Sequence, residues 1–246
     1  MACSEQLIFR KLVGHNYRRA SDARLFLFPN HSITEVQPRY NNQMTNRGPV
    51  APQEYYHVYN RGTEKRKIFL TKNDYERFLI LLYLSNCSKP IQLNNYRGST
   101  SVELLQINRG AALVDIIAYC LMPNHFHLLL RQHTEGGISK FMQKLSTGYT
   151  MYFNVKNERS GALFQGRYKS VHAGDDRYLK YLFSYIHLNP EQPRTYLYSS
   201  YSFFIGKESA WNRILNTESA PLYFESPAEF EKEMTDWLKY TEVEPR

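Results

Sequence analysis

The sequence lacks any hydrophobic run long enough to cross a membrane. Among its 246 residues, no uninterrupted apolar run exceeds seven residues, the length of Phe78–Leu84. A membrane-spanning helix needs about 20 such residues, so we expect no transmembrane helix. Near the N-terminus, Arg10 and Lys11 interrupt the apolar segment Leu7–Val13 before it reaches the length of a signal peptide's apolar region. We therefore expect no signal peptide and a cytoplasmic protein.

Cysteine is scarce as well. The three cysteines, Cys3, Cys87 and Cys120, lie far apart and form no CxxC motif. An odd, scattered set of this kind argues against a disulfide framework and against a zinc finger, and it suits reduced thiols in a cytoplasm. A P-loop is also missing, which argues against an ATP-driven helicase. With 42% hydrophobic and 22% charged residues, the chain has an ordinary globular balance.

Charge is distributed unevenly along the chain. Residues 51–190 hold 18 Lys or Arg against 10 Asp or Glu, whereas residues 191–246 hold 6 against 10. A basic centre followed by an acidic tail suggests a polyanion as the partner of the centre. The chain also contains 20 tyrosines and 14 phenylalanines. Basic residues interleaved with aromatic ones suit single-stranded nucleic acid, although an ordinary core accounts for most of these rings.

The pattern of residues divides the chain into three parts. Residues 1–50 show no sustained periodicity and contain clusters of Asn, Arg and Pro, so we expect a disordered or spurious N-terminal extension. Met44 stands just before the first patterned segment, and one hypothesis is that translation begins there. Residues 51–190 carry regular patterns and are predicted to form the main domain. Residues 191–246 are predicted to form a Tyr/Ser-rich wrap followed by an acidic helix.

Within the main domain, alternating and helical patterns predict a sequence of strands and helices. Strands are expected at 54–61, 113–122 and 125–131, with a strand or ordered loop at 162–172, and helices at 72–86, 138–157, 175–189 and 227–240. The two central strands flank a Pro-Asn turn and are expected to form a hairpin. This order favours an α+β fold in which helices pack on an antiparallel sheet.

The motif His125-Phe126-His127 lies in the second strand of the predicted hairpin. Side chains alternate across a strand, so the two histidines should share one face while Phe126 anchors the other face in the core. Two imidazoles about 6.5–7 Å apart along one strand can converge on a divalent metal. Ordinary surface or hydrogen-bonded histidines would show the same pattern.

A second motif, YIHLNP, closes the predicted helix at 175–189. Tyr185 and Asn189 are four residues apart and should share one helical face, with Tyr181 on the same line. They can equally be tyrosines that border the core and an asparagine that caps the helix end. His187 points away from Tyr185, and we interpret it as structural. The stripe expected to face the sheet consists of Leu179, Leu182, Phe183 and Ile186.

Taken together, the two motifs suggest phosphate chemistry. Two strand histidines and an amide can make a three-ligand site with open positions, and hard oxygen ligands such as phosphate and water suit Mg²⁺ or Mn²⁺. A phenol is a poor nucleophile at its usual pKa of about 10, but it can attack a phosphate that a metal polarises. The products would be a phosphotyrosine and a free DNA 3′-hydroxyl, which can be rejoined without ATP.

At these motifs the chain resembles the single-tyrosine HUH transposases, in particular the REP-associated tyrosine transposase-like group. The matching segments are YYHVYNRG (55–62), AYCLMPNHFHLLL (118–130), GALFQGRYKS (161–170) and YLKYLFSYIHLNP (178–190). The resemblance implies a ferredoxin-like or RRM-like α+β sheet and a transposase that cleaves and joins single-stranded DNA at hairpin-forming element ends.

The resemblance also implies roles for individual residues. Tyr185 would be the nucleophile, His125 and His127 the histidine ligands of Mg²⁺ or Mn²⁺, and Asn189 the third ligand. Tyr181, one turn from Tyr185, is the competing nucleophile. The protein would bind hairpin-forming DNA as a monomer or as a homodimer.

Basic and aromatic residues beside these motifs are candidates for DNA contact. Arg61 ends the first strand, where it can contact DNA or simply belong to a turn. Gly166 permits a close backbone approach, Arg167 and Lys169 can meet phosphates, and Tyr168 can stack on a base. A solvated strand face is the alternative interpretation of this segment.

Two other functions are compatible with the same residues. The chain can be a non-catalytic DNA- or RNA-binding module on the same fold, although the intact histidines, tyrosine and asparagine argue against decay of the site. It can also be a replication or relaxation initiator with related chemistry, although its short length and missing P-loop argue against that function.

Overall fold

The computed structural model describes residues 50–89, 96, 98–220 and 223–243. The predicted N-terminal extension over residues 1–50 lies outside this part, except for its last residue. Within the described part, no helix is both long enough and apolar enough to cross a membrane.

A four-stranded antiparallel sheet forms the centre of the fold, with the strand order β2-β3-β1-β4. The strands are β1 (Tyr55–Arg61), β2 (Val114–Met122), β3 (His125–Gln132) and β4 (Lys169–His172). The predicted hairpin is β2 and β3, joined by the Pro123-Asn124 turn. The last strand is shorter than the predicted segment 162–172. The predicted α+β class with helices on an antiparallel sheet is confirmed.

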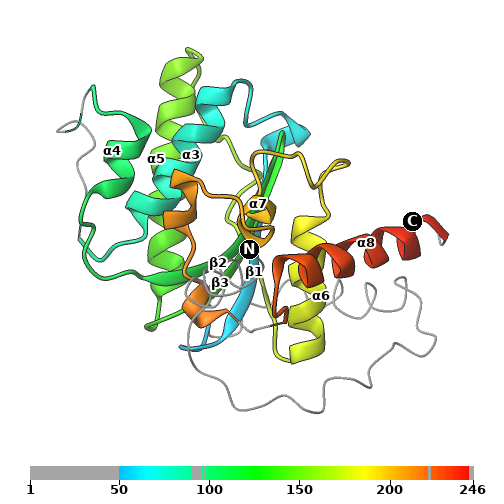
Figure 1. The fold of residues 1–246 in the computed structure, drawn as a ribbon. Coiled ribbons are helices and arrows are strands. Elements are labelled where there is room, and N and C mark those ends of the chain that lie inside the picture. Colours follow the sequence, from blue (N-terminus) through cyan, green and yellow to red (C-terminus); the bar gives the residue numbers. More distant parts are fainter. Residues whose placement is uncertain (1–49, 90–95, 97, 221–222, 244–246) are drawn as a thin grey trace.

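Two long helices cover one face of the sheet: α3 (Lys72–Ser85) and α5 (Gly137–Lys156). Figure 1 shows them side by side, with α6 and α8 across the sheet from them. Thr71 caps α3 as predicted, because the Asp74 carboxylate accepts the Thr71 backbone N–H at 2.9 Å in a capping box. The apolar faces of α3 and α5 meet the sheet in a core that includes Phe78, Phe126 and Tyr149.

The other face of the sheet is covered by α6 (Asp176–His187), and α8 (Pro227–Val243) packs against α6. The four apolar residues of the predicted α6 stripe are all buried in a second core. Asp175 caps α6 by accepting the Tyr178 backbone N–H at 2.8 Å. The helix ends at His187, two residues before the predicted end, because a proline at position 190 disfavours helical geometry in the residue before it.

Several short helical segments were not predicted from the sequence. They are η2 (Thr63–Lys65), α4 (Ser101–Gln106), α7 (Tyr201–Phe204), η4 (Ala210–Ile214) and η5 (Thr217–Ser219). For α4 a signal was present: Thr100 and Glu103 form a capping box, with the Thr100 backbone N–H donating to the Glu103 carboxylate at 2.7 Å.

The predicted C-terminal wrap covers the outer edge of β2. The Leu121 N–H donates to the Tyr198 carbonyl at 2.9 Å, and the Ser200 N–H donates to the Tyr119 carbonyl at 3.0 Å. Further along the same edge, the Asn216 N–H donates to the Ile116 carbonyl at 3.0 Å. These bonds satisfy backbone groups that an open edge strand would expose to pairing with another chain.

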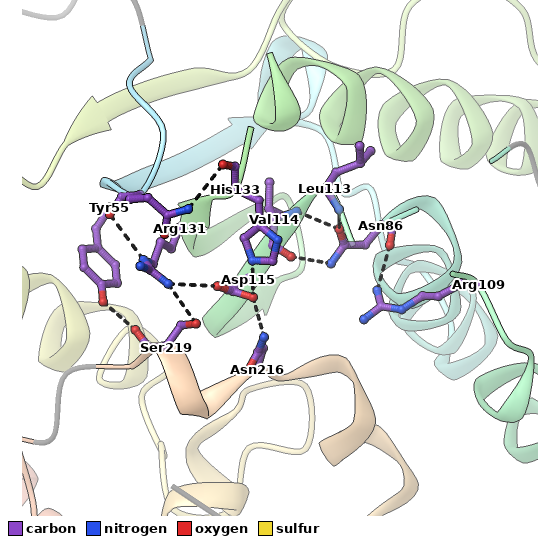
Figure 2. A network of polar contacts seen from close by, with 11 residues as sticks. Tyr55, Asn86, Arg109, Leu113, Val114, Asp115, Arg131, His133, Asn216 and Ser219 are labelled. Carbon is purple, nitrogen blue, oxygen red and sulfur yellow. Dashed lines mark hydrogen bonds and ion pairs between the residues drawn. The ribbon is translucent and has the colours of Figure 1, made fainter. Parts of the chain in front are cut away.

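A buried polar network joins the start of β2 and the end of β3 to the same C-terminal segment (Figure 2). Asp115, which is fully buried, lies 2.7 Å from the His133 side chain and 3.6 Å from the Arg131 guanidinium. The Asn216 amide donates to the same carboxylate, and Arg131 also donates to the Ser219 hydroxyl. Pairing and hydrogen bonding of this kind are what a buried carboxylate requires.

The Asn86 side chain forms another set of buried hydrogen bonds, with the backbone at the start of β2. Its amide oxygen accepts the N–H groups of Leu113 and Val114 at 2.9 and 3.0 Å, and its amide nitrogen donates to the Val114 carbonyl at 2.8 Å. Asn86 is 1% exposed, so water cannot take over these bonds.

We predict that Asn86→Ala lowers the free energy of unfolding by about 3 kcal/mol, at about 1 kcal/mol for each of three buried backbone groups left without a partner. The control is Asn108→Ala, which removes one hydrogen bond to Gly110 N–H from an exposed turn and should cost less than about 0.5 kcal/mol. Urea unfolding followed by circular dichroism measures both. Equal losses of unfolding free energy in the two variants would contradict the conclusion that Asn86 stabilises the start of β2.

Candidate active site

The two histidines of the HFH motif lie on the α6 face of the sheet. Phe126, between them, is fully buried in the opposite core with α3 and α5, as strand alternation predicts. The rings of His125 and His127 lie 5.0 Å apart, centroid to centroid, and are nearly perpendicular to each other. His127 is 6% exposed, and His125 is partly exposed at the end of the strand.

Strand β1 places two further side chains beside His127. Tyr59 is paired directly with His127 across the β1–β3 ladder, and the ring centroids are 5.8 Å apart. His57, two residues earlier on the same face, stacks on His127 at 5.1 Å, with its Nε2 2.8 Å from Nδ1 of His127. Neither residue was predicted to belong to the site. The alternation of YYHVYNR indicates that they share a face, but only the strand register shows which partner they meet.

Tyr185 approaches the histidines from helix α6. Its ring lies 5.5 Å from the His127 ring and 6.0 Å from the His57 ring, edge-on in both cases. Tyr181 stacks on Tyr185 at 6.0 Å and contacts Trp237 of α8 at 5.8 Å. The structure thus brings Tyr185 against the histidine pair, and it places Tyr181 between Tyr185 and the C-terminal helix.

Asn189 completes the group from just beyond the end of α6. It was predicted to share a helical face with Tyr185, but the helix has already ended at that point. Its side chain forms a hydrogen bond with His125. The structure therefore gathers His125, His127, Tyr185 and Asn189 into one site from one strand and one helix end.

The hairpin turn holds His125 in a defined state. Nδ1 of His125 lies 2.6 Å from Oδ1 of Asn124, and the amide nitrogen of Asn124 donates to the Lys65 carbonyl at 3.3 Å. Because an amide oxygen only accepts, Nδ1 of His125 carries the proton and its Nε2 keeps a lone pair.

The Lys65 carbonyl, which accepts the hydrogen bond from Asn124, lies in a short loop with an unusual backbone. Glu64 and Lys65 both adopt left-handed conformations, with φ of 56° and 61°. Gly62 precedes them, and a Cβ atom at that position would lie 2.3 Å from the Arg66 carbonyl oxygen. Left-handed non-glycine residues carry strain of the order of 1 kcal/mol or more and are found where surrounding structure holds them. Here the turn directs the Lys65 carbonyl at Asn124.

The site is electrically neutral at its centre. Burial lowers the pKa of His57 to about 3 and lowers the pKa of His127 well below its usual value, with the neighbouring His57 and His125 adding to the effect. Burial also lowers the pKa of His125, a shift that the hydrogen bond with Asn189 opposes and the charge of Arg61 reinforces. All three imidazoles are therefore neutral near pH 7, which is the form that can act as a metal ligand or a base.

The donor atoms of the site suit a divalent cation. In the described ranges, no cluster of three or more His, Cys, Asp or Glu side chains is arranged to hold a metal ion. The group formed by His125, His127 and Asn189 is of another kind, with two imidazoles and one amide. The Nε2 lone pair of His125 and a neutral His127 provide nitrogen donors that suit divalent transition metals, and the amide oxygen of Asn189 provides an oxygen donor that suits Mg²⁺ or Mn²⁺.

The predicted DNA-contacting residues do not all lie on the same face of the sheet. Arg61 is paired with His125 and Lys169 with Tyr59, so these two exposed cations lie on the histidine face. Nζ of Lys169 lies 6.0 Å from the centroid of the Tyr59 ring. Tyr168 is half-buried on the α5 side, where its hydroxyl is 3.1 Å from the Ser139 hydroxyl. Arg167, between them in sequence, is exposed.

His187 lies outside the site, in agreement with its structural interpretation. It is fully buried in the core between α6 and α8, where its Nδ1 donates to the Phe183 carbonyl at 2.9 Å and its Nε2 accepts from the Ser200 hydroxyl at 2.8 Å. These bonds tie the C-terminal wrap to the helix that carries Tyr185.

Comparisons with known proteins identify a family. Residues 52–189, more than half of the chain, match the family model described as "Transposase IS200 like". No curated protein matches the chain. Among solved structures, a REP-associated tyrosine transposase bound to a REP hairpin is similar, with 14% sequence identity and a TM-score of 0.45 over 66% of this chain and 84% of that one.

Proposed function

The chain belongs to the IS200-like transposase family, and from this membership we propose that it cleaves and rejoins single-stranded hairpin DNA through a phosphotyrosine intermediate. The family is the one that the sequence motifs predicted, and it supports a transposase with DNA endonuclease and strand-transfer activity. The hairpin substrate and the tyrosine mechanism are the parts that we propose.

The observation that carries the proposal is the contact between Tyr185 and His127. A helical phenol lies edge-on against the buried, neutral imidazole of His127 at 5.5 Å, and the Asn189 amide is hydrogen-bonded to the neighbouring, partly exposed His125. Nothing in ordinary core packing requires two histidines, a tyrosine and an asparagine to converge at one end of a sheet. The arrangement provides a nucleophile beside a potential phosphate-binding centre.

In the proposed reaction, the hydroxyl oxygen of Tyr185 attacks the phosphorus atom of the scissile phosphodiester. A bond forms between the tyrosine oxygen and phosphorus, and the bond between phosphorus and the 3′ oxygen breaks. The phenolic proton is released, and the leaving oxygen takes up a proton to become a free 3′-hydroxyl. Because the phosphodiester energy is kept in the tyrosine link, a 3′-hydroxyl can reverse the step and join strands without ATP.

We propose that His125, His127 and Asn189 hold Mg²⁺ or Mn²⁺ in this site. When bound, the metal would polarise the scissile phosphate and make it a better target for a phenol. The residues themselves orient the site: β3 fixes the spacing of the imidazoles, and the end of α6 supplies the amide.

The exposed cations around the site provide a surface for the DNA backbone. Arg61 and Lys169 lie on the histidine face, and Arg167 follows in the adjoining loop. Hydrogen bonds join this loop to the end of β1, from Gln165 N–H to the Arg61 carbonyl at 2.9 Å and from the Asn60 amide to the Gly166 carbonyl at 3.0 Å. Phosphate contacts of this kind position a strand without reading its sequence.

We predict that His125→Ala or His127→Ala abolishes cleavage but leaves most of the hairpin binding. The change removes a metal ligand, whereas affinity comes mainly from distributed phosphate contacts and stacking. Cleavage of a labelled hairpin oligonucleotide with Mn²⁺ and a gel-shift titration measure the two effects. Full cleavage by the double variant would exclude the metal site. Binding without a covalent product in the unaltered protein would favour the non-catalytic module.

We predict that Tyr185→Phe loses the covalent protein–DNA adduct, since phenylalanine has no oxygen to attack phosphorus. The ring remains, so the contacts with His127 and Tyr181 should persist. Tyr181→Phe is the matched control, because it removes one hydroxyl from the same face of the same helix, and it should keep the adduct. Labelled hairpin DNA is incubated with each variant and Mn²⁺, denatured and run on a gel. An adduct from Tyr185→Phe alone would reverse the assignment.

We predict that Lys169→Gln weakens hairpin binding uniformly across sequences. The slope of log affinity against log salt should fall by about 1, which is the change expected for the loss of one phosphate contact. Lys72→Gln serves as the control, because Lys72 is an exposed lysine of α3 on the opposite side of the sheet, paired with Glu76. Fluorescence anisotropy over a salt series measures both slopes. An unchanged slope for Lys169→Gln, or equal changes in both variants, would remove Lys169 from the DNA surface.

A further inference from the structure

His57 has no part in the proposed cleavage step, yet it makes a short polar contact with His127, one of the three proposed metal ligands. Its Nε2 lies 2.8 Å from Nδ1 of His127, and the rings are stacked with an angle of 20° between their planes. Both residues are almost fully buried, at 7% and 6% exposure. The contact is therefore a fixed hydrogen bond between two imidazoles and is shielded from water.

One proton lies in this hydrogen bond, and its position decides what His127 can do. A neutral imidazole carries a proton on one ring nitrogen and a lone pair on the other. If His57 donated, Nδ1 of His127 would be the acceptor, and Nε2 of His127 would carry a proton and could bind no metal. If His127 donates from Nδ1, its Nε2 keeps the lone pair.

The other histidine of the site shows which arrangement the fold favours. Nδ1 of His125 donates to the Asn124 amide oxygen, so Nε2 of His125 carries the lone pair and no proton. His57 occupies the equivalent position for His127, as a buried neighbour that meets Nδ1. In both cases Nδ1 is engaged, so Nε2 is the only ring nitrogen left for a ligand.

We propose that His57 is a positioning residue whose Nε2 accepts the Nδ1 proton of His127, and so keeps the Nε2 lone pair of His127 available to the site. The proposal depends on the proposed function only where it names a metal ion as the group that binds this lone pair. Groups that hold the second nitrogen of a ligand histidine fix its tautomer and its ring orientation.

The surroundings of His57 leave it little freedom to adopt another position. It lies in the middle of β1, paired with Leu129 of β3 on one side and with Val171 of β4 on the other. The Tyr59 ring stacks on it at 4.9 Å, and Tyr185 closes the site at 6.0 Å. Strand pairing therefore fixes the backbone, and the neighbouring rings fix the imidazole.

The first test is the tautomer of His127 in the metal-free protein, measured by long-range ¹H–¹⁵N NMR of histidine-labelled protein. We expect the proton of His127 on Nδ1 and that of His57 on its own Nδ1. A proton on Nε2 of His127 would overturn the proposal. This measurement needs neither metal nor DNA, so it decides the inference even if the proposed transposase activity fails.

The second test is Mn²⁺ affinity, measured by calorimetry on folded protein. His57→Phe keeps the stacked ring and loses the acceptor, and we expect it to bind Mn²⁺ about 10–100-fold more weakly. His57→Gln supplies an amide oxygen in place of Nε2, and we expect it to restore affinity to within about threefold of the unaltered protein.

The control for this second test is His172→Phe. His172 is a histidine of the same sheet that is hydrogen-bonded to Glu54 at 3.0 Å and exposed to solvent. We expect its replacement to leave the Mn²⁺ affinity unchanged. Equal losses in His57→Phe and His172→Phe, or no rescue by His57→Gln, would overturn the proposal. Hairpin affinity should stay the same in all three variants, because none of them removes a lysine or arginine that could contact phosphate.

Discussion

The pairing of β1 with β3 is the constraint on which the candidate site depends. In this register Tyr59 stands opposite His127, and Arg61 stands opposite His125. A shift by one residue would turn the β1 side chains to the other face, and Tyr56 and Val58 would replace the histidine and tyrosine beside His127. The register is fixed from the opposite face, where Val58 and Phe126 are buried in the core with α3 and α5. One face of the sheet thus provides the stability that positions the chemical groups on the other.

The second requirement is the position of α6, which carries Tyr185. Its apolar stripe packs on β2 and β3, and α8 packs beside it with Phe230 and Met234 in the same core. His187 and Ser200 link the helix to the C-terminal wrap, which in turn covers the edge of β2. The acidic C-terminal part is therefore joined to the frame of the site, although its sequence carries none of the proposed catalytic residues.

Local patterns in the sequence predicted the elements better than they predicted the site. Alternation placed His125 and His127 on one face with Phe126 on the other, and helical spacing identified the buried stripe of α6. The participation of His57 and Tyr59 depended on strand register, which results from contacts between residues about 70 positions apart. The end of α6 was placed too late, because the i, i+4 spacing of Tyr185 and Asn189 suggested a continuous helix. The proline that follows ends the helix earlier, and Asn189 reaches His125 from a non-helical position.

The distribution of charge in the site follows from the same packing. Burial between the sheet and α6 keeps His57 and His127 neutral, so the centre of the site holds no positive charge of its own, although the whole chain carries a formal net charge of +8. Arg61 and Lys169 remain exposed at its edge, where a charge costs little desolvation. A phosphate backbone would thus be attracted to the rim, while uncharged nitrogen donors in the centre would stay available to a cation. A protonated imidazole at the centre would repel that cation and offer no lone pair, so the burial that stabilises the neutral form is also what would let the site bind metal.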